Sequence, residues 1–222
     1  MKQGEPTLNK AIHKVVIVGR DAAAWLTALA LQLEFGRGDA ALDVHLVELP
    51  ARVRPQDVFV TLPSQQAFHR ILGLEEGRVL AACSGTYALA QRYSNWSGAA
   101  PAFLHTYDSC GVSLNNVDFF QYWLKAHDGG MPVALEEFSL GAAAAKLGRF
   151  LVFNEESRDF SNATYGYHLD AIPYLQGIGK TALRAGLAHT VAERADVQHD
   201  GERIHSLRLQ DGAIIEADFF TT

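Results

Sequence analysis

The run from Val15 to Trp25 constrains the fold of this chain more than any other feature. Its first part, Val15-Val16-Ile17-Val18, consists only of β-branched residues, which is typical of a short strand buried on both faces. Gly19 then supplies a turn, and an alanine-rich helix follows almost at once. A buried strand, a glycine turn and a helix in this order predict the first βα unit of a dinucleotide-binding α/β domain, in which the pyrophosphate rests on the helix N-terminus.

The glycine pattern of this turn departs from G-x-G-x-x-G, the fingerprint of such sites. Gly19 occupies the first position, but Asp21 stands at the second and Ala24 at the third. A side chain at the second position hinders the close approach of backbone and phosphate, and a carboxylate adds like-charge repulsion. Two interpretations stay open at this point: a weakened nucleotide site, or an ordinary βα unit that never bound a nucleotide.

A second strand is predicted over Asp43–Glu48, and it ends on an acidic residue. In dinucleotide-binding folds, an acid at the end of this strand accepts the hydroxyls of the adenosine ribose. Glu48 lies further from the glycine turn than is usual, which a longer helix and loop would explain. The alternative is a solvent-exposed acid at a strand end.

The composition excludes several classes of partner. Of the 222 residues, 48% are hydrophobic, which is enough for an ample core, and the formal net charge is −6. Without a basic excess, neither nucleic acid nor an anionic membrane is an expected partner. Cys83 and Cys110 form no C-x-x-C motif, which predicts a cytoplasmic protein without a disulfide framework. No histidine has a metal-binding spacing with a partner, so no metal site is expected.

Apolar periodicity and turn residues predict the remaining elements. After a first helix over Ala22–Phe35, helices are expected over residues 64–72, 119–129, 135–147 and 171–188, and strands over 190–197, 203–209 and 213–220. Asp211-Gly212 between the last two strands is a hairpin signal. The aromatic residues of the 119–129 helix, Phe119, Phe120, Tyr122 and Trp123, are most simply core residues.

Seven short motifs occur in a fixed order along nearly the whole chain, from about residue 14 to 222. They are V-G-x-x-x-A-x-W at 18–25, L-V-E at 46–48, T-L-P at 61–63 followed by F-H-R-I-L-G-L at 68–74, Y-S-N-W at 93–96, F-Q-Y-W at 120–123, Y-G-Y-H-L-D-A at 165–171 and I-E-A-D-F-F at 215–220. In this order and spacing the chain resembles the N-terminal part of the flavin-dependent tryptophan halogenases.

The resemblance implies an α/β fold like that of FAD-dependent monooxygenases, with a Rossmann-type dinucleotide-binding domain and a substrate-domain insertion, here truncated. It places the dinucleotide-binding-like domain at 14–60 and 165–222 and the substrate-binding-like insertion at 61–164, after a flexible leader at 1–13. In this family, reduced FAD and oxygen form a hydroperoxide that oxidises chloride to hypochlorous acid. A lysine beside the indole then directs the chlorination of tryptophan. In such a fold, the aromatic helix could also form a wall of the substrate pocket.

Several of the residues that this chemistry requires are replaced. The family lysine falls at Gln66 or Ala67, and no lysine occurs between Lys14 and Lys125. His69 and Arg70 are nearby cations, but arginine does not readily form a chloramine, and we expect His69 on the surface of a helix. The G-E of the family's flavin-ring loop reads Val58-Phe59, which puts bulk where a close backbone approach is needed. These departures predict an impaired or inactive halogenase, a pseudoenzyme with no catalytic residue of its own.

Two hypotheses about function follow. In the first, the chain is a halogenase-like flavoprotein homologue that keeps a weakened FAD site or a pocket for an aromatic small molecule such as tryptophan, and homodimers are plausible. In the second, it is a non-catalytic scaffold that pairs with a partner, for example a full-length homologue, or a fragment of a longer halogenase-like chain. The resemblance implies that FAD, if bound, would contact Gly19, the amides of Ala22, Ala23 and Ala24, Glu48, and Arg194 on the strand after the long helix.

Overall fold

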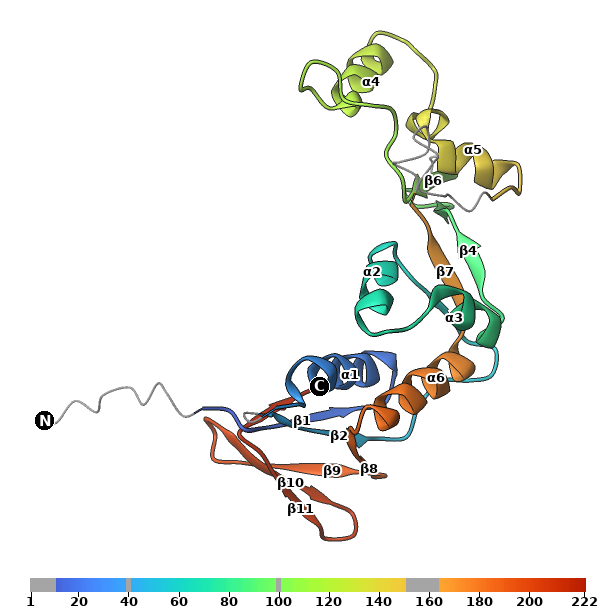
Figure 1. The fold of residues 1–222 in the computed structure, drawn as a ribbon. Coiled ribbons are helices and arrows are strands. Elements are labelled where there is room, and N and C mark those ends of the chain that lie inside the picture. Colours follow the sequence, from blue (N-terminus) through green and yellow to red (C-terminus); the bar gives the residue numbers. More distant parts are fainter. Residues whose placement is uncertain (1–10, 39–40, 99–100, 151–163) are drawn as a thin grey trace, which may run out of the picture. The chain divides into compact units, whose positions relative to one another are not determined.

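The computed structural model describes residues 11–38, 41–98, 101–150 and 164–222. The chain divides into two compact units (Figure 1). The first unit combines Met1–Asp57 with Asp170–Thr222, and the second unit is the stretch Val58–Leu169 between them. In the described part of the chain, no helix has both the length and the apolar character needed to cross a membrane.

The first unit is built on a four-stranded parallel sheet in the order β12-β1-β2-β8. Val15 of the central strand pairs with Val44 on one side and Phe219 on the other. Because parallel neighbours need crossover connections, helices follow β1 and precede β8, and they lie together on one face of the sheet (Figure 1). The elements are β1 (Lys14–Gly19), α1 (Ala22–Phe35), β2 (Asp43–Glu48), α6 (Ala171–Arg184), β8 (Ala188–Val191) and β12 (Phe219–Thr221).

A three-stranded antiparallel sheet covers the opposite face of this parallel sheet. It consists of β9 (Ala195–His199), β10 (Ile204–Leu209) and β11 (Ile214–Glu216), in the order β11-β10-β9. Alternation along the strands directs Val16 and Val47 toward it, where they form a core with Leu207, Leu209 and Ile215. The neighbouring residues Ile17 and Leu46 are equally buried, so β1 and β2 are enclosed on both faces, as the uninterrupted apolar run of β1 predicted for that strand.

The second unit contains two small sheets and several short helices. The strands β3 (Val58–Val60), β7 (Gly166–Asp170) and β4 (Thr86–Ala88) form one sheet, and the hairpin of β5 (Ala90–Tyr93) and β6 (Phe103–Thr106) forms the other. The helices are α2 (Ser64–Ile71), α3 (Glu76–Ala82), α4 (Phe119–Asp128) and α5 (Leu140–Lys146), with a 3₁₀ turn, η1, at Leu135–Phe138.

Local sequence signals predicted several elements correctly, among them α1, β2, α2, α4 and the β10–β11 hairpin. The single helix expected over 135–147 is wrong, because it is interrupted at Ser139. The Ser139 hydroxyl accepts a hydrogen bond from the Ala142 N–H at 2.9 Å and thereby starts a new helix, α5. The helix expected to reach residue 188 ends at Arg184, since Gly186 takes a left-handed conformation with φ of +89°. Helix α3 was not predicted.

Two of the predicted strands are each divided between two sheets. The strand expected over 213–220 comprises β11, which pairs with β10, and β12, which pairs with β1. Asp218 lies between β11 and β12. Its carboxylate accepts hydrogen bonds from the backbone N–H groups of His13 and Lys14 at 3.0 and 3.1 Å, next to β1. The strand expected over 190–197 is likewise β8 and β9, separated by residues 192–194. Both cysteines are free, as predicted.

The first testable prediction concerns the contact between β1 and α1. A Cβ atom added at Gly19 would lie 2.3 Å from the Cβ of Ala24, so Gly19→Ala forces strand and helix apart. We expect it to lower the free energy of unfolding by about 1–3 kcal/mol in urea denaturation. Gly177→Ala is the matched control, because nothing lies within 4 Å of a Cβ there and alanine favours the α6 helix. Equal unfolding midpoints for the two variants would contradict this account.

Candidate functional site

The first candidate site is the N-terminus of α1, where a dinucleotide fold would hold its pyrophosphate. Asp21 is the N-cap residue, with extended backbone, and its carboxylate accepts the Ala23 N–H at 3.0 Å. The carboxylate therefore accepts a hydrogen bond at the helix N-terminus, where a bound anion would otherwise accept one. The adjacent cation, Arg20, donates to the Pro50 carbonyl at 3.4 Å.

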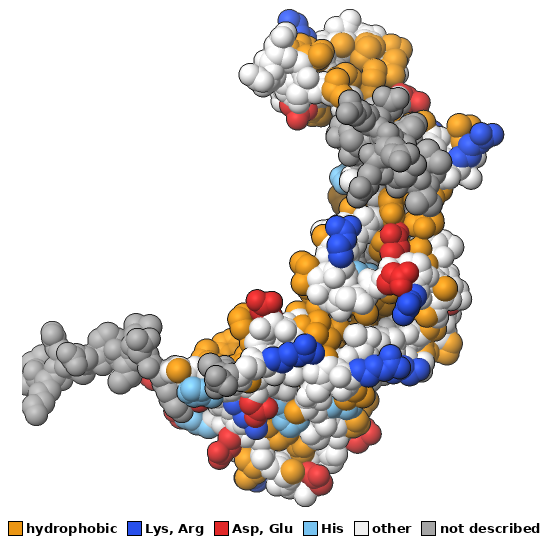
Figure 2. Space-filling view, in the orientation of Figure 1, with side chains coloured by type: hydrophobic (Ala, Val, Ile, Leu, Met, Phe, Trp, Pro, Cys, Tyr) orange, Lys and Arg blue, Asp and Glu red, His pale blue; other side chains and the backbone are white. Residues whose placement is uncertain are grey.

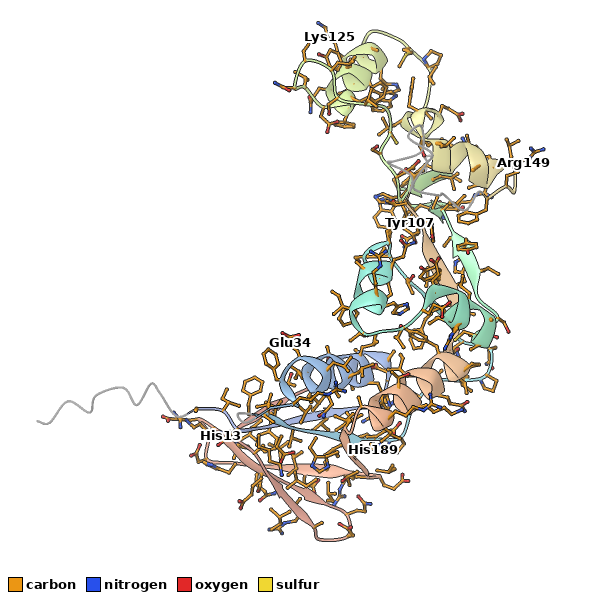
Figure 3. The ribbon with its side chains drawn as sticks, in the orientation of Figure 1. His13, Glu34, Tyr107, Lys125, Arg149 and His189 are labelled. Atoms are coloured by element: carbon orange, nitrogen blue, oxygen red, sulfur yellow. The ribbon has the colours of Figure 1, made fainter. Side chains whose placement is uncertain are left out.

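Glu48, at the end of β2, lies in a network with two side chains that the sequence did not connect to it. The Trp25 Nε1–H donates to its Oε1 at 3.2 Å, and the His189 Nε2 lies 2.9 Å from its Oε2. The Trp25 and His189 rings are in contact, with centroids 4.9 Å apart. His189 lies on β8 (Figure 3), whose parallel pairing with β2 brings it to this position. Glu48 is thus not a fully exposed strand-end acid, because its side chain keeps 29% exposure and each oxygen has a partner.

The resemblance predicts that Arg194 lies on the strand that follows the long helix. This prediction is wrong. Arg194 lies in the turn between β8 and β9, and 72% of its side chain is exposed. Its guanidinium pairs with the Asp196 carboxylate at 3.0 Å. The expectation failed because residues 192–194 carry no strong turn signal within an otherwise strand-like sequence.

The residues at this edge of the sheet do not fit a pyrophosphate as they stand. The N-terminus of α1 already holds a carboxylate, and the negatively charged pyrophosphate beside it would face like-charge repulsion. Gly19 also lies in close contact with Ala24, and this contact packs α1 against the end of β1. The candidate contacts Gly19, Ala22, Ala23, Ala24 and Glu48 are thus brought to one end of the sheet. There the Ala23 N–H is bonded to Asp21, Gly19 packs against Ala24, and Glu48 has Trp25 and His189 as partners.

The second candidate site is helix α2, where the resemblance places the lysine position. The Gln66 side chain donates to the Tyr165 carbonyl at 3.0 Å, and Ala67 is exposed. The expectation that His69 lies on the helix surface is wrong, because only 2% of it is exposed and its ring is parallel to that of Tyr167, with centroids 6.2 Å apart. Burial lowers the pKa of His69, and the nearby Glu76 charge partly opposes this shift.

Two carboxylates, two phenols and the guanidinium of Arg70 line the same small pocket, which has a volume of about 260 Å³. The Tyr165 hydroxyl donates to the Glu76 carboxylate at 3.0 Å, and burial together with this bond raises the pKa of Tyr165 to about 12. Burial and the charge of Glu76 raise the pKa of Tyr167 as well. Both phenols are therefore neutral proton donors at physiological pH. No ammonium group lines this pocket among the residues that the structure describes.

The third candidate site is a larger pocket of about 670 Å³ around α4 in the second unit. Aromatic side chains form much of its wall, and Figure 2 shows hydrophobic side chains gathered over α4. Helix α4 contributes no buried residue, so the prediction that its aromatic residues are core residues is wrong. The lining comprises the aromatic residues Phe103, Phe119, Phe120 and Trp123 together with Leu104, His105, Thr106, Asp108, Ser109, Cys110, Ser113, Asp118, His127, Ala134, Leu135 and Glu136.

Backbone contacts hold the aromatic wall in place. The Trp123 Nε1–H donates to the Val133 carbonyl at 2.9 Å, and the Trp123 ring stacks against His127 with centroids 4.9 Å apart. Gly111 allows Phe119 to approach, since a Cβ there would lie 2.3 Å from the Phe119 ring, and its φ of +65° also favours glycine. The pocket is thus formed by positioned rings rather than by loosely placed surface residues.

Comparison with known proteins decides the family. The sequence profile of the tryptophan halogenases matches residues 14–221, nearly the whole chain. The chain belongs to the tryptophan halogenase family. Tryptophan 7-halogenase RebH from Lentzea aerocolonigenes is 28% identical over 231 residues, which cover 96% of this chain and 42% of RebH. The Streptomyces toxytricini tryptophan 6-halogenase SttH is 26% identical, over 84% of this chain and 39% of its own length.

Solved structures agree with this assignment. A flavin-dependent halogenase from Xanthomonas campestris matches with a TM-score of 0.79 and 28% identity, over 95% of this chain and 42% of the other. BrvH, a flavin-dependent halogenase from a Brevundimonas species, matches with a TM-score of 0.76 and 31% identity, over 94% of this chain and 42% of BrvH. The predicted α/β halogenase fold is therefore confirmed, and the chain spans about two fifths of the length of these relatives.

Sequence reasoning missed Trp25 and His189 as partners of Glu48. Trp25 was noted only as part of a family motif, and His189 lies 141 residues from Glu48 in the sequence, so no local signal joins them. Among the described residues, no group of three or more His, Cys, Asp or Glu side chains is placed to hold a metal ion.

Burial of His69 generates a prediction about acid stability. The unfolded chain binds a proton at this position more readily than the folded chain, because the folded pKa is lowered. The corresponding stability is present above the ordinary histidine pKa of about 6.5 and is lost as the pH falls toward the lowered value. We expect His69→Phe to reduce the loss of unfolding free energy between about pH 7 and pH 5, measured by urea denaturation. His168→Phe, at an exposed position on β7, is the control and should leave the slope unchanged.

Proposed function

We propose that this member of the tryptophan halogenase family binds an aromatic small molecule and does not by itself carry out flavin-dependent halogenation. The observation that carries the proposal is the aromatic-lined pocket around α4, whose volume of about 670 Å³ suits an indole-sized ligand. Relatives are named as tryptophan halogenases, so tryptophan and other indoles are the first ligands to consider.

The loss of halogenation is proposed from the residues at the lysine position. Gln66 is a neutral amide engaged with the Tyr165 carbonyl, and Ala67 has no functional group. Neither can supply the ammonium group that the family mechanism uses to hold an electrophilic chlorine species. His69 cannot replace it readily, because burial favours its neutral form. The other polar side chains of this pocket are the carboxylates Glu75 and Glu76, the phenols Tyr165 and Tyr167, and Arg70, whose guanidinium is a cation but does not readily form a chloramine.

Weak or absent flavin binding is the second part of the proposal. The capping carboxylate of Asp21 and the bonded carboxylate of Glu48 both support it. A non-catalytic scaffold, including a homodimer or a pair with a full-length homologue, is the second candidate function. Exposed apolar residues around the edge strand β3 favour it, with Val58 at 49% and Val60 at 53% exposure. The two free cysteines are in keeping with a cytoplasmic protein.

The flavin part is tested by titrating FAD and following its absorbance and fluorescence. We expect no saturable binding of wild-type protein in the micromolar range. Asp21→Asn keeps the helix cap but removes the charge, and Asp21→Gly also frees the Ala23 N–H. Their FAD affinities are expected to rise by about three- to tenfold, with Asp21→Gly the tighter of the two. Micromolar binding by the wild type that Asp21→Asn leaves unchanged would be the opposite result.

The pocket itself is tested with neutral indole, observed by ligand-detected NMR. We expect saturable binding that Trp123→Ala weakens by about tenfold or more, because the variant removes a fixed aromatic wall. Trp96→Ala is the matched control, since Trp96 is 73% exposed and does not line the pocket. Absence of indole binding at millimolar concentration, or equal effects of the two variants, would reject the pocket as a ligand site.

A further inference from the structure

Among the residues that the structure describes, the α4 pocket is lined by several acidic residues and by no basic residue of the lysine or arginine type. Its carboxylates are Asp108, Asp118 and Glu136. Lys125 is on α4 (Figure 3) but is exposed and is not part of the lining. A ligand in this pocket therefore meets aromatic rings and negative charge.

Internal partners neutralise only part of this charge. Glu136 is paired with Lys146, whose Nζ lies 2.7 Å from its Oε1. Asp108 instead accepts hydrogen bonds from the Ser139 hydroxyl at 2.6 Å and the Gly141 N–H at 2.7 Å, which are dipoles rather than cations. Asp118 accepts the Phe120 N–H at 2.8 Å as the N-cap of α4. Within the described residues, neither aspartate is in an ion pair.

The helix N-termini do not cancel the two aspartates. A helix terminus contributes roughly half a positive charge at most, whereas each carboxylate carries a full negative charge. A second observation agrees with a negative potential: burial chiefly, and the charges of Asp108 and Glu136 in addition, raise the pKa of the Cys110 thiol in the pocket wall. Both carboxylates act on Cys110 by disfavouring its thiolate.

Aromatic rings and uncompensated carboxylates together define a ligand class. An ammonium group is attracted both by carboxylates and by the faces of Trp and Phe rings. A ligand carboxylate would meet like charge, and the described lining contains no lysine or arginine with which it could pair. This inference rests on the proposed function, because it concerns the same pocket. It goes further by distinguishing cationic aromatic ligands from those that carry a carboxylate.

We propose that the α4 pocket takes an arylalkylamine in its cationic form, such as tryptamine, in preference to an aromatic amino acid or an aromatic acid. The aryl group packs against Phe119, Phe120 and Trp123, and the ammonium group faces Asp108 and Asp118. The amino acid carries the same ammonium group but adds a carboxylate that the pocket repels.

The test compares indole, tryptamine, L-tryptophan and indole-3-propionate with the wild-type chain by ligand-detected NMR at low salt. Measurements are made at about pH 8, where an alkylammonium group is still protonated. We expect tryptamine to bind about three- to tenfold more tightly than indole, and indole-3-propionate to bind most weakly.

Asp118→Asn tests the charge without removing the helix cap, because asparagine also caps helices well. It should weaken tryptamine about two- to fivefold and leave indole unchanged. Asp211→Asn is the matched control: Asp211 is an exposed aspartate of the first unit that accepts the Ala213 N–H at 3.0 Å.

The outcomes distinguish this inference from the proposed function. If indole binds but tryptamine binds no more tightly, or if L-tryptophan binds more tightly than tryptamine, the preference for a cation is wrong while the aromatic pocket stands. An Asp118→Asn variant with unchanged tryptamine affinity would likewise overturn the electrostatic basis. If none of the four compounds binds, both the inference and the proposed function are rejected.

Discussion

The contact between Gly19 and Ala24 is the constraint on which the first unit depends. Because Gly19 has no side chain, α1 packs directly against the end of β1. This approach places Trp25 over the sheet, where its ring reaches both His189 and Glu48. The glycine that a dinucleotide fold uses for its turn therefore serves here to join helix and strand, whether or not a nucleotide is present.

Acidic side chains in both units are bound by the chain's own donors. Asp21 and Asp118 cap α1 and α4, Asp108 holds the start of α5, and Glu48 joins Trp25 to His189. The consequence depends on the ligand that each site would take. At α1 the carboxylate stands where an anionic phosphate would have to bind, so it opposes the ligand expected of the fold. At α4 it faces an aromatic pocket, where the same charge favours a cationic ligand.

The sequence predicted those parts of the fold whose signals are local. The β-branched run of β1, the alanine-rich α1 and the Asp118 cap of α4 were correctly located because each is decided within a few residues. The burial of His69 and the bond between His189 and Glu48 could not be predicted, since they arise from packing between segments far apart in sequence. Ser139 was missed for a different reason: its hydroxyl breaks a continuous helical pattern by capping a new helix.

Ligand binding and halogenation require different residues of the chain. In the mechanism that the family resemblance implies, halogenation requires a cofactor cradle and an ammonium group, and the resemblance places Asp21, Gln66 and Ala67 at those positions. Aromatic binding requires only positioned rings, and Trp123 and Phe119 are held by a backbone hydrogen bond and by the space at Gly111. None of Asp21, Gln66 and Ala67 lines the aromatic pocket, so the residues at these positions do not change the contacts that hold its rings. The proposed absence of halogenation and the proposed binding of an aromatic cation are therefore compatible in one chain, because they depend on different residues.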